Sequence, residues 1–449
     1  MNSYVEKRGY AVCQLPAEIS FEQDSQKTVL EIKKRLGKVD WIVLDHYDLN
    51  GLWEKRVREA AEKILTIDDC AGREHDCDIL LNQNFGAKDA WYETNVPETS
   101  VKFIGVDYAL LRPQFMEARA RGINRDGKIR NILVFLGGAD PNNTTMKVLH
   151  AFTSLNRGDL SCDVIIGMSN INIEIIESYS TQHKNVRCHL DVENMAEMMC
   201  GADVYIGSGG SVSWERCCLG LPGIVITIAD NQVAIAKKLN EAGASLYLSD
   251  EQNVTESQIA EKIEYLLDSP EVVKKASNIS FGIVDGRGSE RVAKGMLALS
   301  GNLVLRLADR DDRDKIFEWR NDPKVREMFF DPGPIDKETH NKWFASMLVS
   351  KESLLLIGEL DKDPVGVVRF DISGKSAEIS IYLLPEKIGC GLGLPLVRNS
   401  VKYIFDQVPD IQEVIAKVLP ENIGSVKTFI MSGFKKSANV YKYRRSNLK

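Results

Sequence analysis

The amino-acid sequence predicts an α/β protein that carries a smaller α+β domain towards its C-terminal end. From about residue 30 to 300, short apolar runs rich in β-branched residues alternate with stretches long enough for crossover helices. From residue 302 onwards, several strand-like runs follow one another before a glycine-rich turn and a helix, which is typical of a mixed antiparallel sheet. At 449 residues the chain is also too long for one hydrophobic core.

The α/β region is expected to form two Rossmann-like halves. The polar segment 118–127 has the composition of a linker, so we place the first half at 1–122 and the second at 123–298. The strand-like runs are apolar on both faces, as expected for parallel strands covered by helices. They lie at 41–44, 64–67, 132–135, 164–166, 204–206 and 224–226.

The first half is expected to be incomplete. Residues 5–12 have the pattern of a helix end, a stop at Gly9 and a short strand. An open sheet that begins in this way lacks its first strand–helix unit, whose turn normally carries a ligand. The sequence therefore indicates either a small first half or a chain truncated at its start.

The C-terminal domain is expected to span 302–449. Its first strand is followed by a charged helix at 311–321, and further strands come in direct succession. These strands are predicted at 303–307, 354–358, 364–370 and 377–383.

The charge balance argues against nucleic acid as the main partner. Lys plus Arg number 57 against 64 Asp plus Glu, which gives a net charge of −7. Neutralising a phosphate backbone requires a clear basic surplus. Apolar runs are far shorter than the roughly 20 residues of a membrane-spanning helix, and no signal segment opens the chain. We therefore expect a cytoplasmic protein with no membrane partner.

The nine cysteines agree with that compartment, because no Cys-x-x-Cys pair or disulfide framework is present. Cys70, His75 and Cys77 lie close together in the sequence, but structural zinc sites prefer paired ligands and no fourth ligand is evident. We expect buried or half-buried free thiols and no metal.

Two glycine-rich turns follow predicted strands in the second half, and each precedes a helix. Glycine lets backbone N–H groups approach a phosphate, and a helix N-terminus adds partial positive charge. One such turn is usually plain structure, but two at the same edge of one sheet favour phosphate binding. The turn residues are Gly137, Gly138, Gly209, Gly210 and Ser211.

Glu215 lies one helical turn beyond Ser211, where a carboxylate suits the two hydroxyl donors of a ribose. The alternative is an exposed glutamate near the favourable end of a helix dipole. Further on, Asp230, Asn231 and Gln232 supply three polar side chains at the end of the next strand.

The run 207–216, followed by 220–222 and 229–232, resembles the UDP-binding half of two-domain glycosyltransferase-B enzymes. It is most similar to the UDP-sugar hydrolases of pseudaminic acid biosynthesis, which release UDP from UDP-2,4-diacetamido-2,4,6-trideoxy-β-L-altropyranose. The resemblance implies that Ser211 and nearby backbone hold the diphosphate and that Glu215 holds the ribose. It also implies that Gln232 contacts UDP and that Asn231 and Tyr47 line the sugar pocket.

One departure from that family concerns the general base. The family carries a glycine–histidine pair near its start, and its histidine is the expected base, whereas none of the six histidines here follows a glycine. His46, beside Asp45 after a predicted strand, is the local substitute. The alternative is a structural residue at a strand end.

The C-terminal domain carries Gly389, Gly391 and Gly393 between a strand ending at Leu383 and a helix, and Asn422 follows about thirty residues later. This ordered set resembles the GNAT acetyltransferases, in which a splayed strand and a glycine turn grip acetyl-CoA. The resemblance implies pyrophosphate-binding amides in the turn and a contact of Asn422 with the pantetheine or phosphate region.

Two positions depart from the GNAT pattern. Ile388 stands where a basic or amide residue is expected, and Phe429 stands where a tyrosine often serves as general acid. Segments 317–323 and 340–344 look like the GNAT subgroup that acetylates protein N-termini and nucleotide-linked amino sugars; the alternative is an amphipathic helix with its aromatic residues in the core.

The sequence leads to one hypothesis and two alternatives. The leading hypothesis is a bifunctional enzyme that acetylates a UDP-linked 4-amino sugar with acetyl-CoA and hydrolyses the UDP-sugar product. In the first alternative, the α/β region is a catalytically silent module that binds the UDP-sugar. In the second, the C-terminal domain acetylates protein N-termini.

Overall fold

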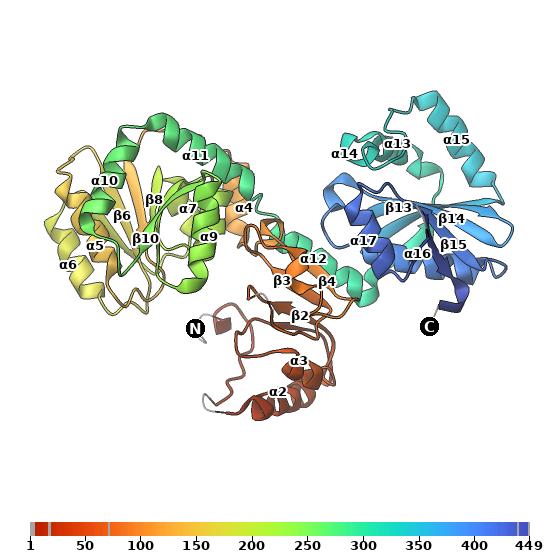
Figure 1. Ribbon diagram of the computed structural model, residues 1–449, viewed down its shortest axis with the longest axis horizontal. Coiled ribbons are helices and arrows are strands. Elements are labelled where there is room, and N and C mark those ends of the chain that lie inside the picture. Colours follow the sequence, from red (N-terminus) through yellow and green to blue (C-terminus); the bar gives the residue numbers. More distant parts are fainter. Residues whose placement is uncertain (1–4, 17–18, 71, 438–439, 448–449) are drawn as a thin grey trace. The chain divides into compact units, whose positions relative to one another are not determined.

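The chain forms two compact units, shown with all three sheets in Figure 1. The computed structural model describes residues 5–16, 19–70, 72–437 and 440–447. The first unit comprises Met1–Leu81, Asp89–Phe103 and Glu290–Lys449, and the second comprises Asn82–Lys88 and Ile104–Ser289. Among the described residues, no helix is long and apolar enough to cross a membrane.

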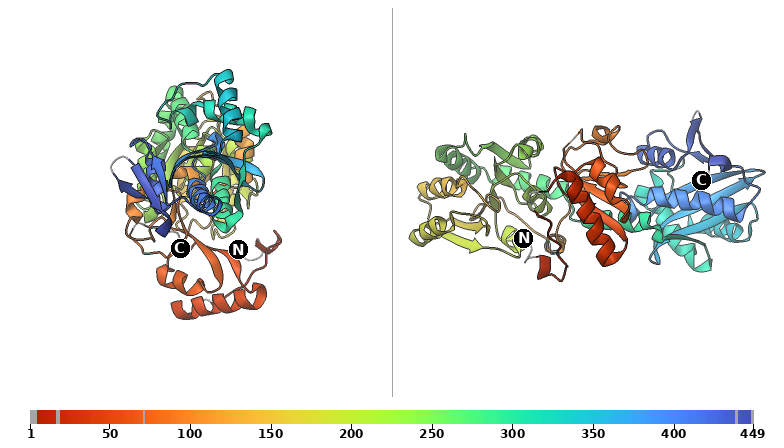
Figure 2. Two further views of the ribbon diagram at one scale, coloured as in Figure 1. Left: turned by 90° about the vertical axis from the view of Figure 1, so that its right-hand side faces the viewer. Right: turned by 90° about the horizontal axis from the view of Figure 1, so that it is seen from below.

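The first sheet has four strands in chain order. They are β1 (Val39–Leu44), β2 (Ala61–Ile67), β3 (Ile79–Asn82) and β4 (Val101–Ile104), and β1, β2 and β3 run parallel. Helices α2 (Phe21–Leu36) and α3 (Gly51–Val57) pack against each other, as both views of Figure 2 show, and Trp53 donates a hydrogen bond of 2.7 Å to Asp24. A capping box between Ser20 and Gln23 sets the start of α2. Short 3₁₀ turns lie at Asp89–Tyr92 and Val106–Tyr108.

The N-terminal residues differ in part from the prediction. Gly9 adopts a positive φ of 83° and ends a short turn, as a stop signal should. Residues 10–12 form no strand, because none of the described strands pairs with them. The sequence also missed β3 and β4, which are four residues long and give too little periodicity to detect.

The second sheet has six strands in the order β10-β9-β8-β5-β6-β7, all parallel. Along β5, Ile132 and Val134 enter one apolar core and Leu133 enters another, so helices cover both faces of the sheet. This burial on both faces explains the continuous apolar runs. The strands are β5 (Asn131–Phe135), β6 (Ser161–Ile166), β7 (Val186–Leu190), β8 (Val204–Gly207), β9 (Gly223–Thr227) and β10 (Ser245–Asp250).

Nine helices accompany the described part of this region. One core contains side chains of α5, α6, α10 and α11, and the other contains side chains of α4, α7, α8 and α9. The helices are α4 (Pro113–Ala120), α5 (Thr144–Ser154), α6 (Ile173–Gln182), α7 (Met195–Cys200), α8 (Val212–Cys218), α9 (Asp230–Glu241), α10 (Glu256–Leu267), α11 (Pro270–Ile283) and α12 (Gly288–Leu297).

Segment 118–127 is anchored to the second unit and is not the free linker that its composition suggests. Arg119 donates hydrogen bonds to the backbone carbonyls of Cys218 and Val284, at 2.7 and 3.0 Å. Arg125 is buried, and its guanidinium donates to three further backbone carbonyls. Composition cannot distinguish an arginine that water solvates from one that satisfies buried carbonyls.

The C-terminal sheet has seven strands in the order β11-β12-β13-β14-β15-β17-β16, and each neighbouring pair is antiparallel except β14 with β15. The mixed antiparallel α+β class predicted for this domain is confirmed. The strands are β11 (Leu303–Leu307), β12 (Ser353–Leu360), β13 (Asp363–Ser373), β14 (Ser376–Leu383), β15 (Glu413–Lys417), β16 (Lys435–Ser437) and β17 (Val440–Arg444). The helices are α13 (Arg313–Asn321), α14 (Pro323–Arg326), α15 (Lys337–Val349), α16 (Gly393–Gln407) and α17 (Ile423–Met431).

A buried cluster of charged side chains joins α3 to the end of β2. His75 Nδ1 lies 2.7 Å from Glu54 Oε1, and His75 Nε2 lies 3.2 Å from Asp68 Oδ2. Thr66 donates to Glu54, and Arg73 Nη2 lies 3.1 Å from Asp68 Oδ1. Burial disfavours the imidazolium, but the hydrogen bonds with Asp68 and Glu54 outweigh it and raise the pKa of His75 to about 9.

We expect the stability of the first sheet to fall at alkaline pH through this histidine. Because the pKa of His75 is about 9 in the folded chain and ordinarily 6.5, its contribution is complete below pH 6.5 and is lost as the pH rises through 9. The contribution is about 3 kcal/mol. Hydrogen exchange of β2, corrected for the intrinsic rate at each pH, measures it.

His75→Gln should remove most of the protection of β2 at pH 6 and should leave little further loss between pH 6.5 and 9.5. His150→Gln is the matched control, because His150 pairs with Glu256 in the other unit and is partly exposed. An identical alkaline loss in wild type and His75→Gln would show that another group titrates.

Candidate functional site

The chain order of the second sheet reverses between β5 and β8. From β5 the chain proceeds outwards through β6 and β7, then returns to β8 and continues outwards on the other side. Open α/β sheets bind ligands outside the carboxyl ends of the strands at such a switch point. Because β5 and β8 pair in parallel with Phe135 opposite Gly207, both predicted glycine turns leave adjacent strands at this edge.

In the first turn, Gly137 has a positive φ of 89°, and a Cβ on Gly138 would meet open space. The helix that follows is already capped by a carboxylate. Asp140 is buried and accepts hydrogen bonds from the backbone N–H groups of Thr144 and Thr145, at 2.8 and 2.9 Å. The N-terminus of α5 is therefore satisfied from within the chain, and the backbone amides of the glycine pair are the groups this turn offers to an anion.

The second turn begins at Gly207, which packs closely against the end of β5. A Cβ on Gly207 would lie 2.0 Å from the carbonyl oxygen of Phe135, so only glycine fits there. Gly209 N donates to Gln232 Oε1 at 3.1 Å, and the same oxygen accepts from Ile228 N at 3.2 Å. Gln232 thus braces the turn against the end of β9, a role that sequence reasoning did not assign.

The other residues predicted to bind the UDP-sugar lie on the solvent side of this turn. Gly210 is half-buried, whereas Ser211 is exposed immediately before α8. Asn231 is also exposed, in the first turn of α9 beside Gln232. These polar groups surround the carboxyl ends of β8 and β9.

Glu215 is half-buried on α8 and pairs with Arg112. Its Oε1 lies 3.3 Å from Arg112 Nη2, and the Arg112 Nη1 donates to the carbonyl of Glu193 at 3.2 Å. Burial raises the pKa of Glu215, and the nearby Arg112 opposes that rise. The arginine fixes a carboxylate one turn past the glycines, where it can accept hydrogen bonds from hydroxyl groups. No local sequence pattern predicts this pairing, because about a hundred residues separate Arg112 from Glu215.

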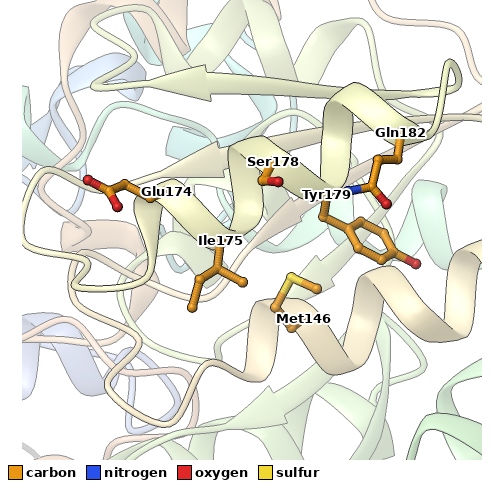
Figure 3. A pocket seen from close by; sticks show the side chains of 6 residues that line it. All are labelled: Met146, Glu174, Ile175, Ser178, Tyr179 and Gln182. Carbon is orange, nitrogen blue, oxygen red and sulfur yellow. The ribbon is translucent and has the colours of Figure 1, made fainter.

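A shallow hollow of about 360 Å³ between α5 and α6 is a separate feature. In Figure 3, Ile175 and Tyr179 point towards Met146, whereas the carboxylate of Glu174 points away. No residue of either glycine turn lines it. Its lining contains Glu174 and no lysine or arginine, which does not suit the phosphates of a nucleotide.

Tyr47 and His46 belong to the first unit and follow β1. The Tyr47 side chain is exposed, and the Arg73 guanidinium lies 6.0 Å from its ring centroid. His46 Nδ1 accepts a hydrogen bond of 3.1 Å from the backbone N–H of Asp48. In neutral His46 the proton is therefore on Nε2, which leaves the imidazole without a free basic nitrogen in this orientation.

Asp68, Asp69 and Cys70, after β2, bring one potential metal-ligand atom each within 4.8 Å of one another. Asp68 is already engaged by His75 and Arg73, and burial raises the pKa of the Cys70 thiol. A cation at this position would have to displace an arginine and deprotonate a thiol.

In the C-terminal sheet, β14 and β15 separate at their carboxyl ends. They pair only from Ser376 to Ile379 of β14, whereas β14 remains paired with β13 as far as Leu383. The backbone from Ser380 to Leu383 therefore has an open edge on the β15 side. This is the splayed strand that the sequence predicts.

The predicted glycine turn follows directly. Gly389 and Gly391 have φ of 79° and 69°, and α16 begins at Gly393. In contrast to α5, no side chain of the described residues caps α16. Its first N–H groups and the turn amides are therefore available to an anion. A Cβ on Gly391 would lie 2.7 Å from the ring of Phe103, which packs against the turn.

Asn422 and Phe429 have identifiable structural roles. Asn422 caps α17, and its Oδ1 accepts from the backbone N–H of Ser425 at 3.0 Å. Phe429 is buried and meets the Phe434 ring edge to face, with centroids 4.9 Å apart. The phenyl ring of Phe429 carries no ionisable proton and cannot act as a general acid.

Two family models match the chain. The model described as the glycosyltransferase family 28 C-terminal domain matches residues 132–287, and the model described as the acetyltransferase (GNAT) domain matches residues 302–435. The first match contains both glycine turns of the second sheet, and the second contains the splayed strand and its turn.

Three relatives cover the α/β part or more. Uncharacterized protein MJ1062 of Methanocaldococcus jannaschii is 24% identical and covers 96% of this chain and 87% of its own length. UDP-2,4-diacetamido-2,4,6-trideoxy-β-L-altropyranose hydrolase of Campylobacter jejuni is 28% identical over 54% of this chain and 83% of its own. Spore coat polysaccharide biosynthesis protein SpsG of Bacillus subtilis is 26% identical over 60% of this chain and 79% of its own.

Among solved structures, spermidine N-acetyltransferase from Vibrio cholerae in complex with CoA and spermine matches 32% of this chain and 97% of its own length, at 19% identity and a TM-score of 0.31. The chain thus joins a domain of the glycosyltransferase family 28 C-terminal type to a GNAT acetyltransferase domain, and its relatives include a UDP-sugar hydrolase of the kind that the sequence resembles.

Proposed function

We propose that this chain acetylates the amino group of a UDP-linked amino sugar with acetyl-CoA, and that its α/β part binds the UDP-sugar product. The observation that carries the proposal is the presence of two sites in one chain. The second sheet has two glycine turns at its switch point, and the C-terminal sheet has the splayed strand β14 followed by a glycine turn and a helix, α16, without a side-chain cap. Relatives named as UDP-sugar hydrolases support the identity of the nucleotide sugar.

In the proposed UDP site, the amides of Gly137, Gly138 and Gly210 and the hydroxyl of Ser211 face the diphosphate, while the Gly209 amide donates to Gln232 and shapes the turn. Glu215 accepts hydrogen bonds from the ribose hydroxyls, and Arg112 holds that carboxylate in position. Gln232 contributes by holding the second turn in place. Asn231 is proposed to contact the sugar, and the sugar contact predicted for Tyr47 stays a prediction.

In the proposed acetyl-CoA site, the open backbone edge ending at Leu383 binds the extended arm of the cofactor by strand-like hydrogen bonds. The amides of Gly389, Gly391 and Gly393 take the pyrophosphate. Asn422, whose oxygen caps α17, is proposed to contact the pantetheine or phosphate region through its amide nitrogen.

The acetyl transfer follows from this arrangement. The acceptor amine attacks the thioester carbonyl, a C–N bond forms, the C–S bond breaks, and the amine proton leaves to solvent. The departing thiolate, with an ordinary pKa of about 8.5, needs only modest help. A phenylalanine at position 429 is therefore compatible with activity.

Hydrolysis of the bound UDP-sugar would need a general base. Neutral His46 offers no free basic nitrogen in this orientation, because its Nδ1 accepts from the backbone N–H of Asp48. This observation favours binding without hydrolysis over the bifunctional alternative, in which the α/β part also hydrolyses the UDP-sugar.

We expect Glu215→Ala to weaken UDP binding by about 1–3 kcal/mol, the range for losing hydrogen bonds to a charged group. Isothermal titration with UDP measures the change. Glu174→Ala removes an exposed carboxylate in the same unit and should leave the affinity unchanged. Equal UDP affinity in Glu215→Ala and wild type would place the ribose elsewhere.

We expect Gly391→Ala to raise the KM for acetyl-CoA by about tenfold or more, because the methyl group would displace the turn from Phe103 and a φ of 69° would strain alanine. Gly374→Ala is the matched control: its φ is 58°, but its Cβ would meet open space at the β13–β14 turn. A comparable KM change in both variants would mean that strain alone, and not the position of the turn, is responsible.

We expect acetyl transfer to be measurable while UDP release is slow, since losing a positioned general base costs about 10²–10⁴ in rate. One reaction mixture containing acetyl-CoA and the UDP-linked 4-amino sugar is sampled for free CoA thiol and for free UDP. UDP release at the rate of acetylation would identify an active hydrolase, and His46→Gln would then test whether that histidine reorients to act as base. Acetylation of a protein N-terminus in place of the sugar would overturn the proposed acceptor.

A further inference from the structure

Three arginines and a tyrosine gather on one face of the C-terminal sheet. Arg320 lies on α13, Arg326 on α14 and Arg369 on β13, and Tyr382 lies on β14. Val367 pairs with Tyr382 and Arg369 pairs with Ser380, so Arg369 and Tyr382 share the same face. Tyr382 packs against the core that also contains side chains of α13 and α15.

Aromatic and backbone contacts hold two of the arginines in place. The Arg320 guanidinium lies 3.8 Å from the centroid of Phe329, whose ring meets Tyr382 edge-on at 5.8 Å. Arg320 Nη2 donates to the carbonyl of Asp331 at 3.2 Å, and Arg326 Nη1 donates to the carbonyl of Pro332 at 3.4 Å. The consecutive carbonyls of residues 331 and 332 thus hold the guanidinium groups of Arg320 and Arg326 near each other.

Each member of the cluster retains an unpaired polar atom. Arg320 Nη1, Arg326 Nε, Arg369 Nε and the Tyr382 hydroxyl are shielded from solvent and have no hydrogen-bond partner in the described part of the chain. Buried donors without partners are costly, so their convergence indicates a ligand rich in acceptors. All four groups can donate, and three of them carry positive charge.

The local carboxylates neutralise the cluster only in part. Asp371 lies 3.0 Å from Arg369, but the Asp331 side chain accepts from the backbone of Gly333. Burial lowers the pKa of Arg320, and the charges of Arg326 and Arg369 add to that effect while Tyr382 and Asp331 oppose it. The three guanidinium groups therefore interact electrostatically, and a surplus of positive charge remains in a chain whose net charge is −7.

The cluster adjoins the proposed place of acetyl transfer. Tyr382 belongs to the Ser380–Leu383 segment of β14, which is the open edge proposed to bind acetyl-CoA. An anion held by the arginines would lie beside the end of that edge.

We propose that Arg320, Arg326, Arg369 and Tyr382 bind the phosphate groups of the acetyl acceptor, so that this GNAT domain selects a phosphorylated amine over a free amino sugar. The inference rests on the proposed function and assigns the substrate class of its acetyltransferase site. Planar guanidinium groups match phosphate oxygens in a bidentate manner, and a phenol adds a neutral donor.

The first test is independent of acetylation. Inorganic pyrophosphate is titrated calorimetrically into the full chain saturated with CoA. Arg320→Gln and Arg369→Gln should each weaken one pyrophosphate site by at least tenfold, whereas Arg313→Gln, an exposed arginine on the same helix that pairs with Asp314, should not. Arg369→Gln is included because Arg369, unlike Arg320, donates no hydrogen bond to the 331–332 segment, so its loss should leave that segment in place. Unchanged CoA binding in each variant shows that the domain is folded. Pyrophosphate binding identical to wild type in both cluster variants would overturn the proposal.

The second test identifies which phosphate is bound. Wild type should acetylate the UDP-linked amino sugar with a kcat/KM at least tenfold above that for the unphosphorylated sugar, and Arg320→Gln should abolish this preference through KM. In Arg320→Gln, the KM values for acetyl-CoA and for acetyl-dephospho-CoA should equal those of wild type. A loss confined to acetyl-CoA would assign the cluster to the cofactor's 3′-phosphate and overturn the proposal. If wild type acetylates no UDP-sugar yet the pyrophosphate site responds to the variants, the proposed function fails and the anion site remains.

Discussion

The parallel pairing of β5 with β8 is the constraint on which the proposed UDP site depends. It makes the order of the parallel strands switch from one side of β5 to the other, and it sets the two glycine turns side by side. Gly207 lies so close to the Phe135 carbonyl that no side chain could be accommodated. Tyr205 donates a hydrogen bond of 2.7 Å to the same carbonyl and fixes the junction from beneath. The site therefore depends on backbone contact between two strands more than on any one polar side chain.

The two turns at this edge are not equivalent. Asp140 supplies a negative charge to the N-terminus of α5, so the first turn has lost the helix end as an anion-binding element. The second turn is instead braced by a neutral amide from Gln232, which adds no charge. In the proposed UDP site, diphosphate binding would consequently be asymmetric, with the Gly210 amide and the Glu215–Arg112 pair on one side of the switch point.

The sequence was informative wherever a signal is local. Apolar runs predicted the central strands, glycines after those strands predicted the turns, and the GNAT motif predicted the splayed β14. Short strands such as β3 and β4 were missed because four residues show little periodicity. The Glu215–Arg112 pair and the arginine cluster were missed because tertiary contacts bring together residues that are far apart in the chain. Segment 118–127 was misjudged because its arginines bind backbone carbonyls that no sequence pattern reveals.

The contact between Phe103 and Gly391 ties the turn that precedes α16 to a strand of the first sheet, although almost 290 residues separate them. The acetyltransferase sequence is recognisable as a self-contained module from residue 302 onwards. A gene fragment cut at that point would nevertheless lose the aromatic ring against which the turn rests. The boundary of the family match is therefore not the boundary of the packing. A domain cut at residue 302 would differ from the intact protein at the Gly391 turn, which would lack its contact with Phe103.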